Sequence, residues 1–470
     1  MIRLLEAAAA RTPSQPAVIT PEGVVSYDDL LAEARRVAAA LTRRGIARFA
    51  IVEPDAAWVL RLLGGAAAAG VEPCQYQPDI DATQFAEQAA TLAHEFVVSR
   101  RADLVGDFTV IRPEELLADS PDAASPAQAP ASDGPQPLMI RTTGTTGLPK
   151  AARHDWSVLA RTALDAKPRP EQRWLLAYGP HQFAGIQVLQ HVVSVGATLV
   201  APFPRQPRDG LDALLAGDLT CVSATPTYWR FLLAEARSRR VSLPALSQIT
   251  LGGEASSPDL LTDLQAAFPS ARISQIYAST EFGSIASVRD GRPGLSAGSL
   301  WSDTNPDGLL RVIDGELWVR AGTGMLGYAG DVPEPGDTAG ATADDTDAGW
   351  KPTGDLVDLV EDRVVFRGRT SEVINVGGVK VHPLPVEDRI TPLPSVAMAR
   401  VFGRPNRLTG AIVAVEIVPE GGLDGADTNE IRRQISAALA DLPPAWHPRS
   451  VKLVASFETR GEKTVRGLQD

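Results

Sequence analysis

The chain has 470 residues, which is longer than a single domain usually is, so the sequence predicts two or more folded units. Hydrophobic residues make up 44 % and charged residues 22 %, which excludes a disordered chain, a collagen and a coiled coil. The net charge of −12 argues against a general binder of nucleic acids or anionic membranes.

Lysine, cysteine and histidine are all informative by their scarcity. Lysine occurs six times among 45 basic residues, so each lysine is a candidate for a role that arginine cannot fill. Cys74 and Cys221 are too far apart for a CxxC pair, and the six histidines form no HxH or HxxxH cluster, which argues against a protein zinc site. The first residues lack the apolar core of a secretory signal, and no stretch is long enough to span a bilayer. We therefore expect a cytoplasmic protein.

Short apolar strands alternate with amphipathic helices through the first 280 residues. Residues 28–46 have apolar side chains at helical spacing and end at a glycine, and FAIVEP follows as a short buried strand. The alternation predicts an α/β domain with layered subdomains. The same kind of unit recurs in ATLVAP with LDALLAG, TCVSATP with TYWRFLLAEARSRR, and SQITLGGEA with SPDLLTDLQAAF and ISQIYAST.

Two segments interrupt this pattern, and the character of the chain changes after them. Residues 119–137 are rich in Pro, Ala, Ser and Asp and predict an exposed connection, and residues 331–349 predict an acidic surface loop. From about residue 360 the chain has short strands and one helix near 428–441. We expect a separate α+β unit of about 100 residues there.

The segment LMIRTTGTTGLPKAARHDW at 138–156 carries the strongest chemical signal. A short strand leads into a loop of threonines and glycines that ends at Pro149 and Lys150. Backbone N–H groups and hydroxyls in such a loop can bind phosphate oxygens, and lysine adds a positive charge. The GxxxxGK[ST] pattern of P-loop proteins is absent, because Leu148 and Pro149 separate Gly147 from Lys150.

This loop resembles the phosphate-loop signature of the adenylate-forming enzymes, which include acyl- and aryl-CoA synthetases, adenylation domains of nonribosomal peptide synthetases, and luciferase. Further segments resemble the other motifs of that family, in the family's order. They are TPTYWRFLL (225–233), LGGEA (251–255), YASTE (277–281), WKPTGD (350–355), FRGRTSEVINVGGVKVHP (366–383) and TRGEKTVR (459–466).

The resemblance implies a two-step reaction. A carboxylic acid attacks the α-phosphate of MgATP to give an acyl-adenylate and pyrophosphate, and a thiol then displaces AMP. It also implies a large N-terminal domain, residues 1–368, which binds ATP and the acid. A small mobile α+β domain, residues 369–470, would turn about a hinge at Ser371.

The resemblance also implies roles for individual residues. Lys463, Thr280 and Glu281 are the predicted catalytic residues, and Glu281 would bind Mg²⁺. Tyr277 would stack on adenine, and Asp355 would bind the ribose with the help of Arg369. The predicted phosphate and adenine contacts are Thr142, Thr143, Gly144, Thr145, Thr146, Gly147, Lys150, Gly252, Gly253 and Glu254.

The acyl pocket and the acceptor site are predicted in the same way. YGPHQFAGIQ at 178–187 lacks the aspartate that amino-acid-activating domains carry, which disfavours an α-amino acid, and Ala278 in place of glycine favours a modest substrate. We therefore expect an aryl or short acyl acid. The pocket candidates are His181, Phe183, Gly185, Trp229 and Ala278, and the candidates for contacting coenzyme A or phosphopantetheine are Gly377, Gly378 and Lys380, which also fit a plain β-turn.

Besides Ala278, three residues depart from the family pattern, and they leave alternatives open. Ser371 stands where the family usually has Asp or Lys, Pro385 where Glu is common, and Glu462 where a Gly precedes the catalytic lysine. The main hypothesis is an acid–thiol ligase that uses coenzyme A or a carrier protein, as a monomer or homodimer, with no nucleic-acid or membrane partner. The alternatives are transfer of the acyl group to an amine, and a nucleotide-binding protein with weak catalysis.

Overall fold

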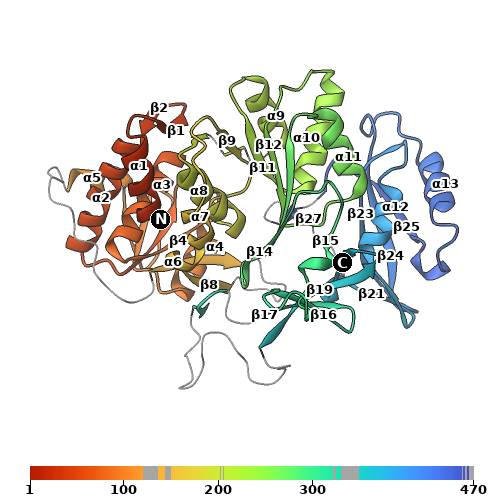
Figure 1. Ribbon diagram of the computed structural model, residues 1–470. Helices are drawn as coiled ribbons and strands as arrows, with labels where there is room; N and C mark the ends of the chain where they lie inside the picture. The colour runs from red at the N-terminus through yellow and green to blue at the C-terminus, as the bar shows by residue number, and fades with distance from the viewer. Residues whose placement is uncertain are drawn as a thin grey trace.

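The computed structural model describes residues 1–119, 136–142, 150–201, 203–204, 206–320, 324–329, 349–457, 459–460 and 463–464. The chain has a mixed α/β fold, which confirms the predicted class. In Figure 1 the first third of the chain lies on the left, the central elements β11, β12 and α9 to α11 lie in the middle, and α12, α13 and β23 to β25 lie on the right.

The largest sheet, here called the central sheet, has eight strands in the order β14-β13-β12-β11-β9-β10-β1-β2. Its inner strands are parallel, whereas the edge strands β2 and β14 run antiparallel to their neighbours. The strands are β1 (Pro16–Thr20), β2 (Gly23–Ser26), β9 (Arg173–Leu176), β10 (Thr198–Val200), β11 (Cys221–Ala224), β12 (Gln248–Gly252), β13 (Arg272–Ser279) and β14 (Gly283–Val288).

A second sheet of seven strands has the order β18-β8-β7-β4-β3-β5-β6. Its strands are β3 (Arg48–Val52), β4 (Glu72–Gln75), β5 (Phe96–Ser99), β6 (Thr109–Ile111), β7 (Pro137–Thr142), β8 (Lys150–Asp155) and β18 (Gly327–Tyr328). The pair β7 and β8 is antiparallel and flanks the predicted phosphate loop, so the sequence on either side of that loop is held by a strand ladder.

Helices cover both faces of these two sheets and form the main cores. One core packs helices α1 (Ile2–Arg11), α2 (Tyr27–Arg43), α3 (Ala56–Ala69) and α8 (Phe183–Val195) against residues of both sheets. On the other face of the central sheet, α9 (Pro207–Leu215), α10 (Pro226–Arg239) and α11 (Pro258–Ala267) form a second core. α4 (Ala82–Thr91) closes the outer face of the second sheet, and the short helices α5 (Pro113–Ala118), α6 (Trp156–Leu159) and α7 (Arg161–Leu164) complete this part.

Capping side chains explain where several of these helices begin. Asp55 accepts a hydrogen bond from the backbone N–H of Trp58 at the start of α3, and Thr225 does the same for Tyr228 at the start of α10. An oxygen at this position satisfies a backbone donor that the helix leaves open. α3 ends at Gly70, whose φ of 68° is in the left-handed region that glycine enters without strain.

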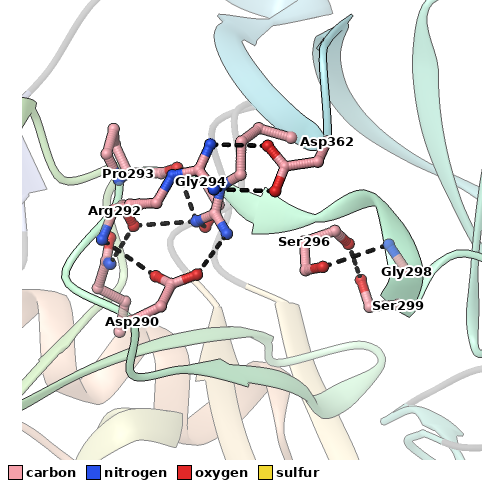
Figure 2. A network of polar contacts seen from close by, with 10 residues as sticks. Asp290, Arg292, Pro293, Gly294, Ser296, Gly298, Ser299 and Asp362 are labelled. Atoms are coloured by element: carbon pink, nitrogen blue, oxygen red, sulfur yellow. Dashed lines mark hydrogen bonds and ion pairs between the residues drawn. The ribbon is translucent and has the colours of Figure 1, made fainter.

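An antiparallel sheet of five strands, in the order β15-β20-β19-β17-β16, follows the central sheet along the chain. Its strands are β15 (Leu295–Ser296), β16 (Leu310–Ile313), β17 (Glu316–Arg320), β19 (Trp350–Val360) and β20 (Arg363–Arg369). A polar network ties this sheet to the segment after β14, and Figure 2 shows the ion pair of Arg292 with both oxygens of Asp362.

Arg363 is the buried centre of the same network. Its guanidinium donates to Asp290 Oδ2 at 2.7 Å and to the carbonyl oxygens of Arg292, Pro293 and Gly294 at 2.8–3.0 Å. Its side chain is 6 % exposed, whereas that of Arg292 is 48 % exposed.

We predict that Arg363→Ala lowers the free energy of unfolding by about 1–3 kcal/mol, because it leaves three backbone carbonyl groups and the half-exposed carboxylate of Asp290 without their partner. Arg292→Ala is the matched control, and we expect it to change the stability little, because its ion pair with Asp362 is exposed to solvent. Urea denaturation followed by circular dichroism measures both changes. Equal destabilisation by the two substitutions would contradict the prediction.

Residues from 374 onward form a further α+β unit with its own core. Its sheet contains β21 (Ile374–Val376), β22 (Val379–Val381), β23 (Val396–Asn406), β24 (Gly410–Pro419) and β25 (Ser450–Leu453), and it packs against α12 (Pro383–Ile390) and α13 (Thr428–Ala438). β26 (Thr459–Arg460) and β27 (Lys463–Thr464) form a separate two-stranded ladder. The predicted domain boundary after residue 368 falls inside β20.

The helices and strands predicted in chain order are present close to their expected bounds. Two connections were predicted, at residues 119–137 and 331–349, and all but a few of their residues lie outside the described part of the chain. In the part of the chain that the structure describes, no helix combines the length and the apolar character needed to cross a membrane.

Candidate active site

A cavity of about 1300 Å³ lies at the carboxyl ends of the strands of the central sheet. Residues from both large sheets, from the antiparallel sheet and from the C-terminal unit line it. Ligands of open parallel sheets bind in this position, because loops leave the strands there and expose backbone and side-chain polar groups. The cavity contains most of the described residues that the sequence assigns to ATP.

The clearest arrangement is centred on Asp355, at the carboxyl end of the sequence WKPTGD. Its Oδ2 accepts a hydrogen bond from the hydroxyl of Tyr277 at 2.7 Å, and its Oδ1 accepts one from Nε of Arg369 at 3.0 Å. β19 and β20 bring Asp355 and Arg369 together, because the two residues are directly paired in the antiparallel ladder. The three residues predicted for adenosine are therefore neighbours, and the carboxylate is held in place from both sides.

The local sequence around Asp355 fixes its orientation. The hydroxyl of Thr353 accepts the backbone N–H of Asp355 at 3.1 Å, and Gly354 has a φ of 77° and donates its N–H to Glu316 at 2.8 Å. Burial raises the pKa of the Tyr277 hydroxyl, and the nearby negative charge of Asp355 raises it further. The phenol therefore remains a proton donor to the carboxylate.

Thr280 and Glu281 lie on the cavity wall just after β13. A carboxylate oxygen of Glu281 accepts a hydrogen bond from the hydroxyl of Tyr328 at 3.3 Å. The ammonium group of Lys150 lies 4.9 Å from the centre of the Tyr328 ring, which is the geometry of a cation–π contact. Thr142 and Lys150 are paired across β7 and β8 and both line the cavity. Lys150, at one end of the predicted phosphate loop, is therefore linked to Glu281 through Tyr328, and Thr142, at the other end, lines the same cavity.

Gly252, Gly253 and Glu254 line the cavity directly after β12. The carbonyl of Gly252 accepts a hydrogen bond from the hydroxyl of Tyr178 at 3.2 Å. A carboxylate oxygen of Glu254 accepts the backbone N–H of Thr227 at 3.0 Å, in the first turn of α10. Glu254 thus also stabilises the start of a helix.

Some predicted residues cannot be placed. Thr143, Gly144, Thr145, Thr146 and Gly147 lie outside the described residues, as does Glu462. The backbone of Lys463 begins β27, but its side chain is outside the described part of the chain. Their assignments stay predictions.

Among the predicted acyl-pocket residues, Phe183 and Ala278 line the cavity. His181 and Gly185 lie next to it in the sequence and the fold but are not part of its lining. A β-carbon on Gly185 would come within 2.2 Å of the carbonyl oxygen of Gly179. Gly185 therefore allows the first turn of α8 to approach the preceding loop.

Trp229 lies elsewhere. It is fully buried in the core between the central sheet and α10, where its ring contacts Phe268 with 5.6 Å between ring centres. The next residue, Arg230, lines the cavity instead, because consecutive helical residues point about 100° apart.

The residues predicted for the hinge and for the thiol acceptor differ in position. Ser371 lies in a short 3₁₀ helix, Thr370–Glu372, and lines the cavity. Gly377 and Gly378 form the turn between β21 and β22, with φ values of 59° and 90°, and Lys380 follows in β22. Such a turn requires positive φ at both central positions, which glycine accepts. These three residues do not line the cavity.

His154 lies beside the cavity, inside the segment 138–156 but outside its loop of threonines and glycines, and the sequence assigned it no role. It lies in β8, is 1 % exposed, and its ring is 5.6 Å from that of Phe183. Its imidazole forms a hydrogen bond with the backbone of Thr280. His154 therefore contacts Phe183 of the predicted acyl pocket and also Thr280 of the YASTE segment.

Burial lowers the pKa of His154 to about 4, although the hydrogen bond to Thr280 acts in the opposite direction. The pKa of His154 is lower in the folded protein than the value of about 6.5 in the unfolded chain, so protonation of His154 favours unfolding. The folded state therefore keeps its full stability above pH 6.5 and loses stability as the pH falls toward 4. We predict that acidification over this range destabilises the protein by up to about 3 kcal/mol through His154 alone. Denaturation of wild type and His154→Gln at several pH values tests this, and a difference between them that stays constant with pH would contradict it.

The residues present fit Mg²⁺ that arrives with a nucleotide. Among the described residues there is no group of three or more His, Cys, Asp or Glu side chains that could hold a metal alone. Mg²⁺ is usually bound by one or two carboxylates together with substrate phosphates, and Glu281 beside Lys150 supplies a single carboxylate of this kind.

Comparison with known proteins agrees with this geometry. A family model described as AMP-binding enzyme matches residues 5–329. The 4-chlorobenzoate–CoA ligase of an Arthrobacter species is 26 % identical, over 87 % of this chain and 84 % of that protein. The isonitrile lipopeptide synthase of Streptomyces coeruleorubidus is 27 % identical over 92 % of this chain, but the chain spans only 30 % of that protein's length.

Solved structures share the fold over nearly the whole chain. The anthranilate CoA ligase AuaEII in complex with anthranoyl-AMP has a TM-score of 0.81 and 19 % identity, and covers 99 % of this chain and 95 % of its own. The amide bond synthetase McbA from Marinactinospora thermotolerans has a TM-score of 0.77 and 23 % identity, and covers 98 % of this chain and 97 % of its own. The family match over most of the chain, together with the shared fold, shows that the protein belongs to the AMP-binding family of adenylate-forming enzymes.

Proposed function

We propose that this protein is an ATP-dependent acid–thiol ligase. It activates an aryl or short acyl acid as an acyl-adenylate and transfers the acyl group to the pantetheine thiol of coenzyme A or of a carrier protein. The observation that carries the proposal is the placement of Asp355, Tyr277 and Arg369 in the same cavity as Thr280 and Glu281.

The first step joins the acid to AMP. An oxygen of the acid attacks the α-phosphorus of ATP, a new P–O bond forms, and the bond to pyrophosphate breaks. Asp355 binds the ribose hydroxyls, and Thr280 donates its hydroxyl to the α-phosphate. When bound, Mg²⁺ neutralises phosphate charge beside Glu281. Groups placed in advance around the reacting phosphate stabilise the charge that develops there.

The second step transfers the acyl group. The thiol sulfur attacks the acyl carbon, the C–S bond forms, and the bond to AMP breaks as the thiol proton is released. Residues 369–470 act as a mobile domain that turns near Ser371 and brings Lys463 to the cavity for the first step. A cytoplasmic location supplies both ATP and the thiol acceptor.

The deciding experiment measures isotope exchange between pyrophosphate and ATP with a panel of aryl and acyl acids. We expect exchange with at least one acid, and its loss in Glu281→Gln. Coenzyme A, a carrier protein and simple amines are then offered together, and the products are separated by mass spectrometry. Amide formation would contradict the thiol acceptor, and ATP binding without exchange for any acid would indicate a nucleotide-binding protein with weak catalysis.

A further inference from the structure

Arg141 is a cavity residue to which the sequence assigned no role. It is the fifth residue of β7, directly before Thr142, and both residues line the cavity. Successive residues of a strand point to opposite faces of the sheet. Arg141 shares its face with Met139 and with its ladder partner Ala151, which both belong to the core that α4 covers. Arg141 therefore reaches the cavity from the α4 side of the ladder of β7 and β8, whereas Thr142 and its partner Lys150 reach it from the other side.

An aromatic ring holds the guanidinium of Arg141 in place. The central carbon of the guanidinium lies 4.3 Å from the centre of the Tyr76 ring, which is the geometry of a cation–π contact. Tyr76 directly follows β4, which is the neighbour of β7 in the second sheet. Tyr76 is fully buried, whereas Arg141 is half-buried and lines the cavity. The guanidinium thus covers the ring on the cavity side, and its position is set before any ligand binds.

The donors of this guanidinium have no acceptor. Arg141 forms no hydrogen bond or ion pair with any residue that the structure describes, and its Nε is buried without a partner. Arg61 and Arg100 also lie over an aromatic ring, that of Trp58, but each of them pairs with a carboxylate. The planar fork of an arginine matches two oxygens of a phosphate or a carboxylate. Arg141 is therefore a candidate for binding an anion that enters the cavity.

The titratable groups around Arg141 are neutral at pH 7 and supply no counter-charge. Burial raises the pKa of the Cys74 thiol to about 12, and burial also raises the pKa of the Tyr76 hydroxyl. The ring of His94 lies 5.7 Å from that of Tyr76, and burial, followed by the charges of Arg48 and Arg141, lowers its pKa to about 4. A partly buried charge is unfavourable unless it is paired. The anion that pairs with Arg141 is therefore expected from a ligand.

We propose that Arg141 binds the diphosphate end of ATP, and the pyrophosphate that leaves it, as a second cation besides Lys150. This inference rests on the proposed function and adds a binding residue to it. Lys150 and Arg141 come from opposite faces of one strand ladder, so the two cations hold the diphosphate from two sides. The ribose end of the nucleotide is expected at Asp355, in the same cavity.

Arg141 acts on the group that leaves in the first step. As an oxygen of the acid bonds to the α-phosphorus, the bond from that phosphorus to the bridging oxygen breaks, and its electron pair leaves on pyrophosphate. Arg141 meets the negative charge that grows there, and a cation placed in advance stabilises such charge. It takes part in no proton transfer, because a guanidinium stays protonated in proteins. AMP lacks this diphosphate, so its binding does not depend on Arg141.

The test compares three ligands by isothermal titration in the presence of Mg²⁺ and without an acid: ATP, pyrophosphate and AMP. Arg141→Gln should bind ATP and pyrophosphate about 10- to 100-fold more weakly than wild type, which is the loss expected for a charge-assisted contact. Its affinity for AMP should stay within about twofold of wild type, which also shows that the variant is folded. Arg141→Lys keeps the charge but loses the planar fork, so we expect a smaller loss.

Two more positions complete the design. Tyr76→Leu removes the ring under the guanidinium and should weaken pyrophosphate binding about 2- to 5-fold, whereas Tyr76→Phe, which keeps the ring, should retain the affinity. Arg289→Gln is the matched control, because Arg289 is an exposed arginine of the same cavity and directly follows β14. It should bind all three ligands as wild type does.

The outcomes separate this inference from the proposed function. Pyrophosphate binding that Arg141→Gln leaves unchanged, or AMP binding that weakens as much as pyrophosphate binding, would overturn the inference. If Arg141→Gln does not fold, Arg141→Lys decides, and a wild-type affinity for pyrophosphate in that variant would overturn it. Weaker pyrophosphate binding in the variants, with no exchange by wild type for any acid, would support the inference and contradict the ligase activity. Acid-dependent exchange with the same KM for pyrophosphate in wild type and Arg141→Gln would do the reverse.

Discussion

Asp355→Ala should reduce acid-dependent ATP–pyrophosphate exchange by about 100-fold or more, mainly by raising the KM for ATP. Each hydrogen bond to a charged carboxylate contributes about 1.5–3 kcal/mol, and two ribose hydroxyls would lose theirs together. The substitution also leaves the hydroxyl of Tyr277 and the guanidinium of Arg369 without the group that holds them. The predicted adenosine site would lose the carboxylate that orients both of these side chains.

Asp358→Ala is the matched control for Asp355→Ala. Asp358 lies three residues further along β19, and its exposed carboxylate pairs with Arg367 at 3.2 Å. We expect exchange to stay within about twofold of wild type, because exposed ion pairs contribute little. If both substitutions lowered exchange equally, the loss would reflect damage to β19, and the assignment of Asp355 to ribose would be wrong.

Lys463→Ala should slow formation of the acyl-adenylate by about 10²- to 10³-fold, which is the usual effect of removing one preorganised donor from a reacting centre. The reason is that Lys463 is predicted to bridge the acid and the α-phosphate in the first step only. Transfer from a chemically synthesised acyl-adenylate to the thiol should therefore remain close to the wild-type rate. Single-turnover measurements of the two steps distinguish them.

Lys452→Ala provides the comparison for Lys463→Ala. Lys452 is 71 % exposed on β25 and its ammonium lies 3.6 Å from Glu416. Both changes remove one of the six lysines and the same charge from the C-terminal unit. If Lys463→Ala slowed both steps to the same extent, or behaved as Lys452→Ala does, the predicted role of Lys463 would fail.

The sequence predicted the fold class, and most of the described residues that it assigned to ATP lie in one cavity. This was possible because the motifs are short and local sequence sets the backbone around them: Glu281 follows the end of β13, and Asp355 follows Gly354, whose positive φ lies within β19. The pairing of β19 with β20 then brings Arg369 to Asp355, which agrees with the predicted partnership.

Other features depend on contacts that no local pattern encodes. TPTYWRFLL indicates a helix, but not which face of α10 meets the cavity, so Trp229 was assigned to a pocket from which it is turned away. His154 reaches Thr280 through the long-range assembly of two sheets, and Tyr328 reaches Glu281 in the same way.

The close approach of Gly185 to the carbonyl of Gly179 also has a practical consequence for redirecting the enzyme to other acids. A library that varies α8 should leave Gly185 unchanged, because any side chain there would displace the loop that precedes the helix. Gln187, Val188 and His191 are the useful positions, since they face the cavity from the same helix. Variation at these three sites would change the shape and polarity of the acid channel without disturbing the end at which the nucleotide is expected.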